Sequence, residues 1–142
     1  MLGIDILKQH LGQQEVRDNK ALKTWLKSQA INKDIAIDPA KISWCSAAIN
    51  ACEREVGHKG TGSLLAQSWL KWGTKVNPDD AQEGDVIIFH FPFNLAWQGH
   101  VGYFVEWDDE DNKVKCLGGN QQNMVCYAEY IQDYIIGIRR AI

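Results

Sequence analysis

The hydrophobic pattern of this chain changes its period near Gly84, and that change limits the folds available to it. Before this point, apolar residues recur at helical spacing, which predicts helices over 4–11, 20–30, 44–56 and 63–72. After it, apolar runs and alternation predict strands over 85–91, 100–107, 114–117, 124–127 and 134–139. Helices followed by an antiparallel meander of strands are typical of an α+β fold. In the strand at 100–107, the alternation predicts one shared face for Val101, Tyr103, Val105 and Trp107.

The chain has 142 residues, which predicts a single domain spanning 1–142. Its net charge of -3 gives no basic field for nucleic acid. The first residues show no basic stretch followed by an apolar run, so we expect no signal peptide and synthesis in the cytoplasm. No window of about 18 apolar residues occurs, so we expect no membrane insertion.

Cys45 is the candidate nucleophile because it stands at the start of a predicted helix. Ser43 is the predicted N-cap of that helix, and Gly57 the residue that ends it. A helix N-terminus and a neighbouring imidazolium both lower the pKa of a thiol. Cys52 lies seven residues further along the same helix face, away from the helix start, and is predicted to be a core residue.

His100 is the candidate general base among four histidines. It begins the alternating strand and follows Gly99, which permits close approach of another backbone. His10 is predicted to lie on the surface, and His90 to pack or support the site. His58 belongs to a glycine-rich loop and is predicted to line a cleft.

Asn120 is the candidate for the residue that orients the histidine, although Gln121 and Gln122 could also take this role. It follows Gly118-Gly119, a pair that also favours a turn. Cysteine and histidine are zinc ligands, yet Cys45, Cys52, His58 and His100 contain no short Cys-x-x-Cys or His-x-x-x-His spacing. We therefore expect no metal and no cofactor.

Five segments occur in a fixed order along the chain: Trp44-Cys45-Ser46-Ala47-Ala48, the stretch from Gly62 to Gly73, 84–89, Gly99-His100-Val101-Gly102 and Leu117-Gly118-Gly119-Asn120-Gln121. Together they resemble the NlpC-like and CHAP-like papain-type cell-wall hydrolases, especially a compact branch found in phages. The resemblance implies a papain-like core with the nucleophile helix packed on an antiparallel sheet. It also implies Cys45 as nucleophile, His100 as base and Asn120 as orienting residue. Candidate substrate-binding residues are Trp44, His58, Trp97 and Gln121.

The implied activity is that of a cysteine amidase or endopeptidase, which cleaves peptidoglycan in the stem peptide or at its link to muramic acid. A monomeric phage endolysin fits this activity best: it would be made in the host cytoplasm, exported with the help of a holin, and active in the periplasm or cell wall. Two alternatives stay open. One is a secreted antibacterial effector amidase paired with an immunity protein. The other is a non-catalytic module that binds the cell wall.

Overall fold

The computed structural model describes residues 1–29 and 37–142. The helices are α1 (Gly3–Lys8), α2 (Asn19–Gln29) and α3 (Cys45–Glu55), with 3-10 helices η1 (Ala66–Lys71), η2 (Pro78–Asp80) and η3 (Gln132–Tyr134). The strands are β1 (Thr74–Lys75), β2 (Val86–Phe89), β3 (His100–Asp108), β4 (Lys113–Gln121), β5 (Met124–Ile131) and β6 (Ile135–Arg140). In the described ranges, no helix has the length and hydrophobicity needed to span a membrane.

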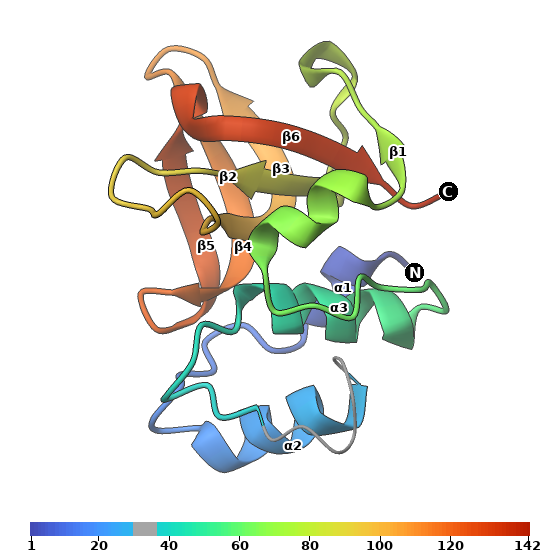
Figure 1. Ribbon diagram of the computed structural model, residues 1–142, viewed down its shortest axis with the longest axis vertical. Helices are drawn as coiled ribbons and strands as arrows, with labels where there is room; N and C mark the ends of the chain where they lie inside the picture. The colour runs from blue at the N-terminus through green and yellow to red at the C-terminus, as the bar shows by residue number, and fades with distance from the viewer. Residues whose placement is uncertain (30–36) are drawn as a thin grey trace.

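All strand pairs are antiparallel, and the six-stranded sheet has the order β1-β6-β2-β3-β4-β5. The helices α1, α2 and α3 gather on one side of the molecule and the sheet occupies the other (Figure 1). Helix α3 is central, since it contacts α1, α2, β3 and β4. The α+β fold predicted from the sequence is therefore confirmed.

Two groups of buried apolar side chains hold this arrangement together, one on each face of the sheet. The first lies between helices and sheet and includes the fully buried Trp44 and Trp69. The second lies on the opposite face and includes Phe89, Phe104 and Cys116. Because α3 packs into the first group, its N-terminus is fixed relative to β3 and β4.

Long-range pairing explains most differences from the sequence prediction. Strand β6 leaves the meander of β3, β4 and β5 and pairs with β2 and β1. The helix predicted over 63–72 is only the 3-10 helix η1. The predicted connector at 31–42 and the end of the second helix at Ala30 fall largely outside the described residues.

A β-bulge in β3 redirects Trp107. The pairing with β4 shifts between Phe104 and Glu106, so Val105 is an extra residue. Val105 shares the face of Val101 and Tyr103, as predicted, but Trp107 lies on the other face against Phe104, with ring centroids 5.0 Å apart. The predicted shared face of Val105 and Trp107 is therefore wrong, because one inserted residue inverts the alternation beyond it.

Asp85 joins the start of β2 to the end of β6, and its removal should destabilise the fold. Its buried carboxylate accepts hydrogen bonds from Arg140 Nε at 2.7 Å, from Arg140 Nη2 at 2.8 Å and from the backbone N–H of Gln82 at 2.8 Å. We expect Asp85→Ala to lower the free energy of unfolding by about 2 kcal/mol, since the guanidinium is partly solvated. Urea denaturation tests this, with Asp111→Ala in the exposed β3–β4 turn as the control, expected to change stability by less than about 0.5 kcal/mol.

Candidate active site

Cys45 is the first residue of α3, and only 2% of its surface is exposed. The N-cap of the helix is Trp44, whose side chain makes no capping hydrogen bond, so the prediction of Ser43 as N-cap is wrong. Ser43 instead places its hydroxyl 3.9 Å from Cys45 Sγ. Trp44 is fully buried, and its indole Nε1 donates to Glu15 at 3.3 Å. Trp44 therefore anchors the helix start at Cys45, and this buried position contradicts its predicted role in substrate binding.

His100, the first residue of β3, lies close enough to Cys45 for each side chain to shift the pKa of the other. Burial on its own would raise the pKa of the Cys45 thiol, but the hydrogen bond and charge of His100, with smaller contributions from Val101 and Ser43, lower it overall. Burial would lower the pKa of His100, but its contacts with Cys45 and Gln121 raise it overall. Both shifts favour a thiolate paired with an imidazolium.

Gln121 is the residue that orients the His100 ring. His100 Nε2 and Gln121 Oε1 are 2.9 Å apart, and Gln121 Nε2 donates to the carbonyl of Cys126 at 2.6 Å. Because a carbonyl oxygen only accepts, this second bond fixes the amide with its oxygen toward the histidine. His100 Nε2 therefore carries a proton, and Nδ1 is the ring nitrogen that remains to interact with the Cys45 sulfur.

Asn120, predicted for this role, instead donates from Nδ2 to the Ser43 hydroxyl at 3.2 Å. The cause is a bulge in β4: Gly118 pairs with Cys126 and Gln121 pairs with Met124, so β4 holds one extra residue. Asn120 adopts a left-handed conformation with a φ of 58°. Regular alternation would turn Asn120 to the face of Gly118, but the bulge turns Gln121 to that face. The Gly-Gly-Asn sequence is itself typical of such a bulge, and this was the signal that could have identified Gln121.

Both glycines before Asn120 are required by close contacts. A Cβ on Gly118 would lie 2.7 Å from Gln121 Oε1, and a Cβ on Gly119 would lie 2.6 Å from the Trp44 ring. The first glycine leaves room for the orienting amide, and the second lets β4 pack on the start of α3.

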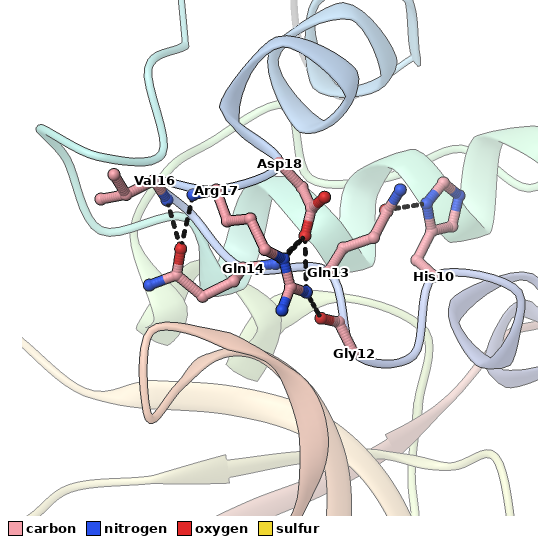
Figure 2. A network of polar contacts seen from close by, with 7 residues as sticks. All are labelled: His10, Gly12, Gln13, Gln14, Val16, Arg17 and Asp18. Atoms are coloured by element: carbon pink, nitrogen blue, oxygen red, sulfur yellow. Dashed lines mark hydrogen bonds and ion pairs between the residues drawn. The ribbon is translucent and has the colours of Figure 1, made fainter.

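Residues 12–15 brace the β4–β5 turn that follows Gln121. The backbone N–H groups of Gly12 and Glu15 donate to the carbonyls of Val125 and Asn123, both at 2.9 Å, and the Val125 N–H donates to Gln13 at 2.9 Å. A polar network keeps the adjoining segment folded: the Gln14 side chain accepts from the N–H groups of Val16 and Arg17, and Arg17 binds Asp18 (Figure 2). The β4–β5 turn is thus held in place by the segment of residues 12–15.

Three aromatic rings enclose His100, and none of them was predicted to belong to the site. Ring centroids lie 6.2 Å away for Phe89, 6.3 Å for Phe91 and 5.4 Å for Tyr130. The Tyr130 hydroxyl is 3.4 Å from His100 Nε2, and burial raises the pKa of this phenol well above its usual value. His100 and Gln121 are themselves buried, and a hydrogen bond in such surroundings is stronger than one in water.

A surface groove of about 350 Å³ leads to Cys45. One wall is formed by residues 64–66 and the other by the loop that carries Phe93 and Trp97. Trp97 thus lies where it was predicted, with 58% of its surface exposed. His58 lies beyond the C-terminal end of α3, with Nδ1 2.9 Å from Glu53 Oε1. It lines other hollows of the surface, so its predicted place in the wall of the groove at Cys45 is wrong.

The described residues offer no obvious cation site. Within 1–29 and 37–142, no group of three or more His, Cys, Asp or Glu side chains is placed to hold a metal ion. The polar groups of the site are engaged with one another, through the contacts of His100 with Cys45 and Gln121. The arrangement suits nucleophilic chemistry by a thiolate.

Comparison with known proteins gives a structural match. No family model matches the sequence, and no curated protein matches it. The fold matches the crystal structure of a protein described as similar to lipoprotein, of the NLP/P60 family, from Staphylococcus aureus subsp. aureus Mu50, with a TM-score of 0.53 and 24% sequence identity. The match covers 85% of this chain but 40% of that one, so the chain spans less than half the length of that protein. This likeness shows that the chain has an NlpC/P60 papain-like fold.

Proposed function

We propose that the protein is a cysteine-dependent hydrolase that cleaves an amide bond of peptidoglycan, either in the stem peptide or at its link to muramic acid. The observation that carries the proposal is Cys45 at the start of α3 beside His100, whose Nε2 is bonded to Gln121. The resemblance to cell-wall hydrolases and the NlpC/P60-like fold support peptidoglycan as the substrate class. The groove at Cys45 gives a substrate access to the thiolate.

The mechanism follows from the positions of these groups. The Cys45 thiolate attacks the carbonyl carbon of the amide, and the resulting oxyanion is stabilised by the backbone N–H of Cys45, which has no acceptor within its helix. The His100 imidazolium donates its proton to the departing nitrogen, and a thioester and a free amine result. His100 then takes a proton from water, whose oxygen attacks the thioester. Collapse releases the carboxylic acid and restores the thiolate and imidazolium.

Digestion of purified peptidoglycan, with mass spectrometry of the soluble products, tests this function. New amino and carboxyl ends should form with the wild-type protein, and the fragment masses identify the bond. The Cys45→Ala protein is the control for contaminating hydrolases. Intact peptidoglycan after incubation with folded wild-type protein, for both Gram-negative and Gram-positive walls, would contradict the proposal.

A narrower part of the proposal is biological: the protein acts as a phage endolysin, made in the host cytoplasm and released to the wall by a holin. The compact hydrolase-like motifs support this role. Expression in the bacterial cytoplasm should then leave cells intact, and adding a holin should lyse them. Lysis that is unchanged by the holin, or absent in its presence, would contradict the endolysin role without contradicting the hydrolase activity.

Single variants at the two neighbouring positions test whether Gln121 or Asn120 orients His100. Gln121→Ala removes the acceptor for His100 Nε2–H, so the ring is free to rotate. We expect kcat to fall about 10- to 100-fold, as for other losses of an orienting group. Asn120→Gly removes the bond to Ser43 but keeps the left-handed conformation of the bulge, so it should change kcat less than about threefold. Steady-state kinetics on one peptidoglycan fragment provides the measurement, and the reverse order of the two effects would reject Gln121.

A further inference from the structure

The groove that ends at Cys45 is lined by neutral side chains. Leu64 and Leu65 form one wall, and Phe93 and Trp97 form the other. The polar side chains of the lining are hydroxyl, thiol or carboxamide groups, so the described lining carries no lysine, arginine, aspartate or glutamate. Leu65, Phe93 and Trp97 are 46%, 81% and 58% exposed, which leaves their apolar surfaces available to a ligand.

The aromatic wall is held in a fixed conformation. Gln67 reaches across from η1 and donates from Nε2 to the carbonyls of Ala96 at 2.8 Å and Gln98 at 2.7 Å. Within the loop, the N–H of Phe91 donates to Asn94 Oδ1 at 2.7 Å, and the N–H of Leu95 donates to Gln98 Oε1 at 2.8 Å. A ligand therefore meets a loop whose backbone is already placed, which lowers the entropy lost on binding.

The same bonds determine what the polar part of the groove can recognise. The side-chain oxygens of Asn94 and Gln98 are used inside the loop, which leaves their NH₂ groups to donate to a carbonyl oxygen. A carboxylate placed here would lose its hydration without gaining a cationic partner from the lining. The Cys45 thiolate at the end of the groove is paired with the His100 imidazolium, so the pair offers no net positive charge to a carboxylate.

We propose that this groove selects amide substrates whose neighbouring groups are uncharged, so that a stem peptide with a carboxamide beside the scissile bond reacts in preference to one with a free carboxylate. The inference rests on the proposed hydrolase function and narrows its substrate class. The groove distinguishes the two substrates by the charge of the group beside the scissile bond, and not by hydrophobicity alone.

The test uses two synthetic muramyl tripeptides that differ only at the glutamyl α-carboxyl group, free in one and carboxamide in the other. We expect kcat/KM to be at least about tenfold higher for the carboxamide. Leu65→Arg places a cation in the groove wall and should remove or reverse this preference. Ile136→Arg is the matched control, because Ile136 on β6 is 44% exposed and lies outside the groove lining.

Binding to the Cys45→Ala protein, measured by calorimetry with the same two peptides, separates this inference from the proposed function. Cleavage of both peptides at equal rates, or faster cleavage of the carboxylate, overturns the charge selection and leaves the hydrolase intact. Cleavage of neither peptide, with tighter binding of the carboxamide, supports the selection and contradicts the function. If neither peptide is cleaved, and both bind equally or not at all, the charge selection and the hydrolase function are both overturned.

Discussion

Cys45→Ala is expected to reduce peptidoglycan cleavage by more than about 10⁴-fold, to the level of the uncatalysed background. The variant removes a sulfur that lies at the N-terminal end of α3, beside His100 and at the end of the groove. Among the described residues, no other cysteine meets all three conditions. Without it no thioester can form, and the oxyanion donor has no tetrahedral intermediate to stabilise. Mass spectrometry of products that accumulate over hours can measure cleavage rates across this range.

Cys52→Ala is the matched control for this variant. Cys52 lies on the same helix, is fully buried, and has a pKa raised well above the usual thiol value, first by burial and then by Glu53 and Glu55. Its loss should cost about 1 kcal/mol of stability and leave kcat within about twofold of wild type. Equal activity losses in the two variants would show that the cysteines act through folding, and retained activity in Cys45→Ala would reject Cys45 as nucleophile.

His100→Ala is expected to lower kcat/KM about 10³-fold, because it removes both the proton donor to the leaving amine and the base for hydrolysis. It should also raise the pKa of Cys45. Burial alone raises that pKa, and His100 makes the largest contributions that lower it. The fraction of thiolate at neutral pH should therefore fall.

The pH dependence of alkylation by iodoacetamide measures this shift directly. In wild type, Cys45 should react at pH values below the ordinary thiol range, and in His100→Ala the reaction should begin only at higher pH. His100→Gln retains a polar side chain at the same position, and it serves if the alanine variant fails to fold. An alkylation profile that does not move in either variant would contradict the ion pair. A structural role of His100 would lower activity without moving this profile.

The local parts of the site could be predicted from the sequence because they depend on short-range patterns. Small residues and a terminating Gly57 define the helix that begins at Cys45, and alternation after Gly99 defines the strand that begins at His100. The α+β order of the elements follows from the same patterns. These features need no knowledge of which strands pair.

The remaining parts depend on pairing between distant segments. One extra residue in β4 decides whether Asn120 or Gln121 meets His100, and one extra residue in β3 turns Trp107 to the other face. The hydrophobic period along one strand gives no information about a register shift relative to the partner strand. His58 illustrates the same limit, since its glycine-rich loop fits a cleft wall, but the length of α3 carries it away from the groove.

The pairing of residues 12–15 with the β4–β5 turn also has a consequence for aggregation. An edge strand with free N–H and C=O groups can recruit a strand from another molecule. At one edge of this sheet β1 has only two residues, and at the other the start of β5 is covered, with Gln14 bridged to Met124. The segment that braces the site thus also shields the start of this edge, so mutations that detach it should promote self-association as well as disturb Gln121.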